Sequence, residues 1–378
     1  MVTGIICEYN PLHNGHKKQL ELLRSAHPEG TAVCLMSGNF VQRGQPAIFH
    51  RSLRAQAALQ AGADLVLELP VTYALSSAEG FAAGGVSILS SFCQQLCFGA
   101  ETPDADSLWA LAQALNAPEF SDFLQPQLEK GLSFPAARQL ALQTMGTDAS
   151  LLEKPNNILA VEYCKAIISQ NSKMKPFVIF RDGDYHDPQA DTENPSATGV
   201  RQRILEGQDW AQYVPSPKIF EAAPIHHIHA GQRAILARLR TMTDGDFEAL
   251  PFGSEGLWRK LMHASREEAT LDQILSSVKS KRYTRSRLDR MVMCAFLGIT
   301  EQTMRAPAPY VRILGFNDQG RQLLNEIKKD MSLVNIGQTV DDPYQLLEQR
   351  CDDLYGLFCA QAPGAPGTSR HQRVEYRK

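Results

Sequence analysis

Two histidines, His13 and His16, stand three residues apart at the expected start of a helix, with Gly15 between them. The unpaired N–H groups and positive dipole end of a helix N-terminus favour an anion, and a glycine there lets a phosphate approach the backbone. Two imidazoles at this spacing can face one anion and donate hydrogen bonds that strengthen as negative charge develops on it. The pattern indicates transition-state stabilisation at a nucleotide phosphate, without a covalent intermediate on the protein.

Two other interpretations of the histidine pair stay open. Histidines at this spacing can be metal ligands, but no carboxylate or cysteine stands nearby at the usual spacing to complete a site, so we predict no metal-binding residues. A pair of solvated surface histidines is the second alternative, because short motifs have low specificity.

The elements around the pair must hold it at the edge of a sheet. Residues 2–7 are apolar and partly β-branched, as in a central parallel strand, and Asn10-Pro11 ends that strand. Further strands are expected at 32–36, 65–69, 96–99 and 177–181, with helices at about 16–26, 51–61, 76–91, 105–115 and 155–169. This alternation predicts an α/β fold with a Rossmann-like doubly wound parallel sheet, which binds ligands at the carboxyl ends of its strands.

The pattern changes after about residue 215. Helices are expected at 233–240, 255–263, 270–278, 284–297 and 319–328, with one strand at 310–315. We therefore predict a catalytic domain over residues 1–214 and a mainly helical C-terminal accessory domain over 215–359. Residues 360–378 are rich in Pro, Gly and Ser and then basic, which predicts a disordered tail.

Composition excludes several classes of protein. No apolar run approaches eighteen residues and no basic segment precedes an apolar one at the N-terminus, so neither a membrane span nor a signal peptide is expected. The 8 cysteines include no Cys-x-x-Cys pair, which favours free thiols in a reducing compartment. These features predict a cytoplasmic protein with no membrane partner.

A basic segment interrupts an otherwise nearly neutral chain, whose net charge is −3. Cations there could contact an RNA backbone while the aromatic ring stacks on an unpaired base. The alternative is a solvated helix face, because charge runs are common. The residues that we predict to bind RNA are Lys279, Lys281, Arg282, Tyr283, Arg285 and Arg287, and we call them the basic strip.

The ordered motifs resemble one protein family. His13-Asn14-Gly15-His16 matches the His-x-Gly-His signature of the nucleotidyltransferase and class I aminoacyl-tRNA synthetase superfamily, and residues 8–16 resemble its bacterial tRNA-Met cytidine acetate ligase branch. The resemblance continues through 36–44, 63–70, 98–101, 155–159 and 281–287. Leu12 stands where the family suggests an aromatic residue, Gln45 where it suggests Glu, and His50-Arg51 where it suggests Lys-Trp. These departures leave the two histidines unchanged.

The resemblance implies an ATP site around His13 and His16. A second element, Ser196-x-Thr198-x-x-Arg201, is similar to one that grips the β and γ phosphates in the superfamily, although an ordinary helix cap is an alternative. Whether Asn156 or Asn157 contacts ATP stays open, as does whether Glu8 holds Mg²⁺ or a ribose hydroxyl. The predicted ATP-binding residues are Ile6, Cys7, Glu8, Tyr9, Asn10, Pro11, Leu12, Asn14, Gly15, Lys17, Lys18, Gln19, Gly99, Asn156, Arg181, Ser196, Thr198 and Arg201.

The function implied by the resemblance is ATP-dependent acetylation of N4 of the wobble cytidine of elongator tRNA-Met, through acetyl-AMP. ATP, with Mg²⁺, and acetate would be the small-molecule partners. Three alternatives remain: a small-molecule adenylyltransferase of cofactor biosynthesis, a non-catalytic RNA-binding module, and a relative of the aminoacyl-tRNA synthetases. The first needs no basic strip, the second does not need the histidines, and the third would prefer an amino acid to acetate.

Overall fold

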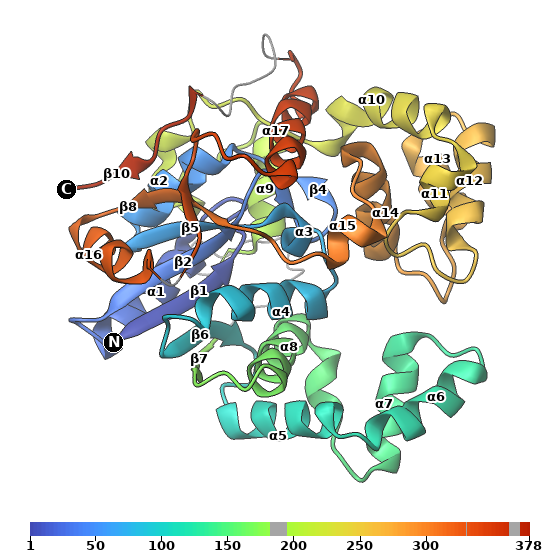
Figure 1. The fold of residues 1–378 in the computed structure, drawn as a ribbon, viewed down its shortest axis with the longest axis horizontal. Helices are drawn as coiled ribbons and strands as arrows, with labels where there is room; N and C mark the ends of the chain where they lie inside the picture. The colour runs from blue at the N-terminus through green and yellow to red at the C-terminus, as the bar shows by residue number, and fades with distance from the viewer. Residues whose placement is uncertain (182–194, 330, 363–370) are drawn as a thin grey trace.

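The chain forms one mainly parallel sheet that is covered on both faces by helices, with a separate group of helices beside it (Figure 1). The structure, a computed structural model, describes residues 1–181, 195–329, 331–362 and 371–378. The strand order is β10-β8-β5-β2-β1-β6-β7, and β9 pairs with β8. The strands are β1 (Val2–Cys7), β2 (Thr31–Ser37), β5 (Leu65–Leu69), β6 (Gln95–Ala100), β7 (Lys175–Phe180), β8 (Val311–Phe316), β9 (Leu333–Asn335) and β10 (Glu375–Tyr376).

The order of the parallel strands confirms the predicted doubly wound sheet. From β1 the chain moves to β2 and then β5 on one side, and afterwards returns to place β6 and β7 on the other side. The direction of winding therefore reverses between β1 and β6. Ligands of such sheets bind outside the carboxyl ends of the strands at this point, which is where His13 and His16 follow β1.

Alternating side chains of the central strands build a core on each face of the sheet. Ile6 packs on the side of α4, α5 and α8, whereas Ile5 and Cys7 pack on the side of α1, α2 and α9. The helices of the first region, including two between 117 and 149 that the sequence analysis did not anticipate, are α1 (Asn14–Ala26), α2 (Arg51–Gln60), α3 (Val71–Ala74), α4 (Ala78–Leu89), α5 (Ala105–Asn116), α6 (Phe120–Glu129), α7 (Phe134–Thr144), α8 (Pro155–Ser169) and α9 (Ala197–Leu205).

The helical region has a core of its own, which includes Ile235, Leu261 and Met291 and also takes in Phe40 and Leu75 from the first region. It contains α10 (Ile228–Thr241), α11 (Asp244–Glu248), α12 (Leu257–Glu267), α13 (Leu271–Val278), α14 (Arg285–Leu297) and α15 (Glu301–Arg305). Figure 1 shows this group of helices to one side of the sheet. No described helix is long and apolar enough to cross a membrane.

The C-terminal part of the chain differs from the predicted organisation. After α15 the chain returns to the sheet, where β8 pairs antiparallel with β5, and α16 (Asp318–Ile327) and α17 (Pro343–Tyr355) follow. Residues 371–378 are not a tail without structure, because β10 pairs with β8. Residues 363–370 lie outside the described residues. The predicted boundary at 359 therefore divides a sheet whose hydrogen bonds join β5, β8 and β10.

Candidate active site

His13 and His16 lie against one another at the start of α1. Their rings stack with centroids 3.7 Å apart, and the backbone N–H of His13 donates to Nδ1 of His16 over 3.3 Å. His13 is 1% exposed, and its Nε2 has no hydrogen-bond partner among the described residues. A Cβ on residue 15 would lie 3.1 Å from Cε1 of His13, so the glycine permits this close packing. The spacing brings both imidazoles together, as the sequence predicts.

Both imidazoles are neutral at neutral pH. Burial lowers the pKa of His16 to about 3, and the nearby Arg181 lowers it further. Burial also lowers the pKa of His13 well below its usual value, and the neighbouring His16, Arg181 and Arg201 lower it further. A neutral imidazole has one N–H to donate. The pair can therefore supply hydrogen bonds to an anion while the arginines supply the positive charge.

A cleft of about 270 Å³ opens beside His16, at the carboxyl ends of β1, β6 and β7. Predicted site residues that are up to 195 positions apart in the chain, such as Ile6 and Arg201, meet in this cleft. The predicted ATP-binding residues that line it are Ile6, Cys7, Glu8, Tyr9, Asn10, Gln19, Gly99, Asn156, Arg181 and Arg201, together with the predicted catalytic residue His16.

The start of α8 shows which asparagine faces the cleft. Glu101 caps this helix, since its carboxylate accepts from the backbone N–H groups of Asn156 and Asn157. Asn157 is buried and bonds to Thr102. Asn156 lines the cleft, where Arg181 donates to its Oδ1 over 3.3 Å. Asn156 is therefore the one of the two that a ligand in the cleft can reach.

The start of α9 lies at the other side of the cleft. Ser196 caps the helix, because its Oγ accepts from the N–H of Gly199 over 3.0 Å. Arg201 donates to the Asn10 carbonyl over 2.8 Å and to Thr198 Oγ1 over 3.1 Å. Arg201 lines the cleft, whereas Ser196 and Thr198 are not among the lining residues. The Arg201 guanidinium is thus held at the loop that follows β1.

Some predicted residues lie away from the cleft. Lys17 and Lys18 are exposed, and Lys17 pairs with Glu21 over 3.3 Å. The helical period explains this, since it turns His16 and Gln19 toward the cleft and the residues between them outward. Pro11 and Leu12 are buried, and Asn14 donates to the Gln212 carbonyl. Their predicted contact with ATP stays a prediction.

A hairpin that sequence reasoning did not assign to the site forms one wall of the cleft. It consists of β3 (Phe40–Val41) and β4 (Gln45–Pro46), and Val41, Gln42, Arg43 and Gln45 line the cleft. Gln42 donates its backbone N–H to Glu8 Oε1 over 2.7 Å. The resemblance across residues 36–44 was the available signal, but no spacing rule shows that this hairpin folds back over β1.

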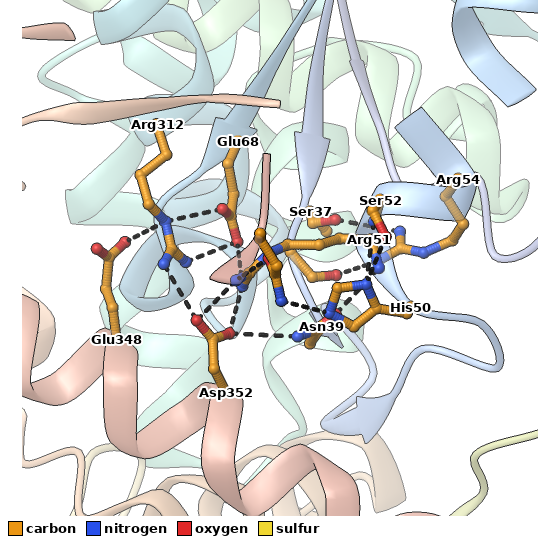
Figure 2. Close-up of polar contacts among 12 residues, drawn as sticks. Ser37, Asn39, His50, Arg51, Ser52, Arg54, Glu68, Arg312, Glu348 and Asp352 are labelled. Carbon is orange, nitrogen blue, oxygen red and sulfur yellow. Dashed lines mark hydrogen bonds and ion pairs between the residues drawn. The ribbon is translucent and has the colours of Figure 1, made fainter. Parts of the chain in front are cut away.

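A buried network of charged groups joins the segment just before the hairpin to α2, β5 and α17 (Figure 2). Arg51 of α2 forms ion pairs with Glu68 at the end of β5 and with Asp352 of α17. Asn39, just before the hairpin, donates to Asp352 and accepts from the Arg51 N–H. Arg54 donates to the carbonyls of Glu8, Ser37 and Gly38. The network ties the C-terminal helix to the two loops that border the cleft.

The basic strip differs from its prediction in one respect. Tyr283 is 4% exposed and packs in the helical core, where its hydroxyl donates to Glu255 over 3.4 Å and Arg287 lies over its ring. It is therefore not available to stack on a base. Four exposed polar residues, 279–282, precede Tyr283, and burial of its large ring in the core is favourable.

The arginines of the strip are paired within the protein. Arg282 pairs with Glu255 over 2.6 Å, and Arg285 pairs with Asp272 and Asp289. Arg287 donates to the Phe252 carbonyl. Lys279 and Lys281 are exposed and form no ion pair in the part of the chain that is described. The two lysines therefore carry the exposed positive charge of the strip.

The cleft, the histidine pair and the sheet define a nucleotidyltransferase of the His-x-Gly-His class, and the comparisons agree. Residues 1–366 match the family described as HIGH Nucleotidyl Transferase. A tRNA(Met) cytidine acetate ligase of Clostridium acetobutylicum is 36% identical over 88% of this chain and 89% of its own length. One from Clostridium perfringens is 37% identical over 94% and 95%. The chain belongs to the tRNA(Met) cytidine acetate ligase family, which confirms the resemblance.

Solved structures agree over the whole length. Thermotoga maritima TmcAL without ligand has a TM-score of 0.89 at 28% identity, and the same protein bound with alpha-thio ATP has a TM-score of 0.87 at 29% identity. Each match covers 99% of both chains. The fold predicted from the sequence is therefore that of a solved nucleotide-binding relative.

Proposed function

We propose that this protein is a ligase that activates acetate with ATP and transfers the acetyl group to N4 of the wobble cytidine of elongator tRNA-Met. The observation that carries the proposal is the buried His13, whose Nε2 has no partner within the described residues and which lies near Arg181, Arg201 and His16 beside the cleft. Curated relatives named tRNA(Met) cytidine acetate ligase support the choice of substrate.

The first step needs stabilisation of charge on phosphate. An acetate oxygen attacks the α-phosphorus of ATP, the bond from that phosphorus to the bridging oxygen breaks, and pyrophosphate leaves. The N–H groups of His13 and His16 donate to the α-phosphate and the leaving pyrophosphate as charge builds there. Arg201, at the loop after β1, supplies a bidentate guanidinium to the phosphates. The products are acetyl-AMP and pyrophosphate.

The second step needs proximity. The N4 amine of cytidine attacks the acetyl carbonyl, the bond from that carbon to the AMP oxygen breaks, and one N4 proton passes to solvent. Cytidine N4 is a weak nucleophile, so holding it against the mixed anhydride supplies much of the rate. No nucleophilic side chain of the protein is required.

A magnesium ion would accompany ATP in this proposal. The cleft offers the Glu8 carboxylate, whose Oε1 accepts from the Gln42 N–H, and no group of three metal-ligating side chains occurs among the described residues. Mg²⁺ commonly takes one or two carboxylates with substrate phosphates and water. Glu8 would be its protein ligand, and the ion would neutralise charge on the triphosphate.

The helical region would hold the tRNA. Lys279 and Lys281 present the exposed charge, and the strip begins α14, which packs against the cleft hairpin. A tRNA substrate and free thiols fit a cytoplasmic location. The small-molecule adenylyltransferase alternative would make no use of these cations.

The test follows label from radioactive acetate into bulk tRNA with ATP and purified protein. We expect transfer by the natural chain, loss of both adenylate formation and transfer in His16→Ala, and weaker transfer with unchanged adenylate formation in Lys279→Glu/Lys281→Glu. An exposed histidine elsewhere, His263, gives the matched control variant His263→Ala. Pyrophosphate release with a mononucleotide and no labelled tRNA would instead indicate an adenylyltransferase.

A further inference from the structure

Tyr163 of α8 lines the cleft but has no role in the steps described above. It is 3% exposed, and its hydroxyl makes no hydrogen bond to any described residue. The hydroxyl is not one of the fully buried atoms that lack a partner, so it reaches the space of the cleft, where a ligand oxygen can accept from it. Burial raises the pKa of Tyr163, and the neighbouring Cys7 and Glu8 raise it further, so the group stays a protonated donor.

The start of α4 lies beside α8. Lys165, two residues along α8, pairs with Glu79 in the first turn of α4 over 3.2 Å. Ala78, the first residue of α4, lines the cleft, and Ser77 caps the helix through the N–H of Gly80. The positive end of this helix and the Tyr163 hydroxyl therefore border the same cleft. Together they form a setting for a carboxylate or a carbonyl oxygen.

The wall around these polar groups is apolar. Phe81 and Phe98 line the cleft, and the ring of Phe98 lies 5.4 Å from that of Tyr163. Ile6 completes the wall and is packed so closely on α4 that a Cβ on Gly85 would collide with it. These side chains belong to the core on the α4 and α8 face of the sheet. Closely packed core side chains move little, so the volume of this space is fixed.

We propose that the acyl group of the carboxylate substrate binds here, between α4 and α8, with the Tyr163 hydroxyl donating to one carboxylate oxygen and the alkyl group against Phe81 and Phe98. The inference rests on the proposed function, since it concerns the acid that ATP activates. The ligand class is a short unbranched carboxylate. The other carboxylate oxygen then faces the α-phosphate near the end of β1.

The size of the wall sets the preference among acids. An additional methylene must displace an aromatic ring that is fixed in the core, which disfavours longer chains. An acid without a second carbon has no alkyl group to contact the rings of Phe81 and Phe98. We therefore expect acetate to be preferred over propionate, and propionate over butyrate.

The test is carboxylate-dependent exchange of labelled pyrophosphate into ATP by the full-length protein, without tRNA. Tyr163→Phe is expected to raise KM for acetate about 10-fold, because one hydrogen bond is lost, and to leave KM for ATP within about 2-fold. Phe81→Leu, which keeps the core filled, is expected to raise the propionate-to-acetate ratio of kcat/KM by about 10-fold. The matched control is Tyr213→Phe, a buried tyrosine outside the cleft, which should change neither value.

The outcomes separate this inference from the function on which it rests. If the natural chain exchanges pyrophosphate with acetate, but Tyr163→Phe leaves KM for acetate unchanged or raises both KM values equally, the acyl site lies elsewhere. Unchanged acid selectivity in a folded Phe81→Leu protein gives the same conclusion. Absence of exchange with every carboxylate in the natural chain would overturn the proposed function and the acyl site together.

Discussion

The cleft and the basic strip were both found from the sequence, but their side chains are arranged in opposite ways. Beside the cleft, the buried His13 has ring nitrogens without a partner among the described residues; in the cleft wall, Tyr163 has a hydroxyl that makes no hydrogen bond to a described residue. In the strip, Arg282 pairs with Glu255, Arg285 pairs with Asp272 and Asp289, and Tyr283 is buried in the core.

The difference shows how well a motif with fixed spacing and a run of charged residues each predict a functional site. A buried group without a partner costs free energy, so it persists where a ligand completes it. An exposed arginine finds a carboxylate at little cost, and such pairs contribute little to stability. Motif spacing therefore predicts the cleft well, whereas a run of charges leaves open which cations remain available.

The largest effect is expected at His13. His13→Ala should lower the rate of acetyl-adenylate formation about 100-fold or more, because a hydrogen bond to the developing phosphate charge is lost. Pyrophosphate exchange measures this rate, with His263→Ala as the exposed control. A rate within 3-fold of the natural chain would show that the buried imidazole is structural.

Gly44 joins the two regions and gives the next largest effect. It has φ +71°, and a Cβ there would collide with the backbone of Asp289 and Arg290 in α14. Gly44→Ala should lower the free energy of unfolding by about 2–4 kcal/mol and impair both adenylate formation and transfer. Gly131→Ala is the control, since it has positive φ but nothing within 4 Å, and should cost only about 1 kcal/mol. Equal costs in denaturant titrations would mean that contact with α14 is unimportant.

The unpaired lysines should matter more to tRNA than the paired arginines. Lys279→Glu/Lys281→Glu is expected to raise KM for tRNA about 10-fold at low salt and to leave adenylate formation unchanged. Arg285→Ala should have a smaller effect, because its charge is already balanced by Asp272 and Asp289. A larger rise in KM for tRNA in Arg285→Ala than in the lysine variant, measured over a salt series, would contradict the inference that the two lysines carry the exposed charge.

The buried histidines should make stability depend on pH. Their pKa values are lowered in the folded state, so the unfolded chain binds protons first as pH falls below about 6.5. The stabilisation is complete above that pH and is lost on the way toward pH 3. Between pH 7 and pH 5.5, the free energy of unfolding should fall by about 1 kcal/mol less in His16→Gln than in the natural chain. Denaturant titrations at the two pH values measure this difference. Identical losses would indicate that His16 titrates normally.

The smallest effect is expected at Tyr283. Tyr283→Phe removes one long hydrogen bond to Glu255 and keeps the ring in the core. KM for tRNA should stay within about 2-fold, and Tyr283→Leu should affect stability more than tRNA binding. If Tyr283→Leu weakened the free energy of tRNA binding by about 1–3 kcal/mol without a matching loss of stability, Tyr283 would stack on a base after all.

The sequence predicted most of the first region because its signals are local. Apolar runs gave β1 at 2–7 and β5 at 65–69, and the expected helix at 155–169 is α8. The helices at 120–129 and 134–144 were not anticipated, β8 was expected only as one strand beside the helical region, and the residues of β10 were expected to be part of a disordered tail. Pairing between residues 251 positions apart, such as Leu65 and Phe316, leaves no mark on local periodicity.

The sequence by itself determined the fold class, the two histidines and the family, because each depends on residue types at short spacing. Only the tertiary structure decided that Asn156 and not Asn157 faces the cleft, that Tyr283 is buried, and that Tyr163 borders the site. These outcomes depend on which distant segments pack around a side chain. Burial and partner choice are properties of the assembled core, so they become visible only when the chain is folded.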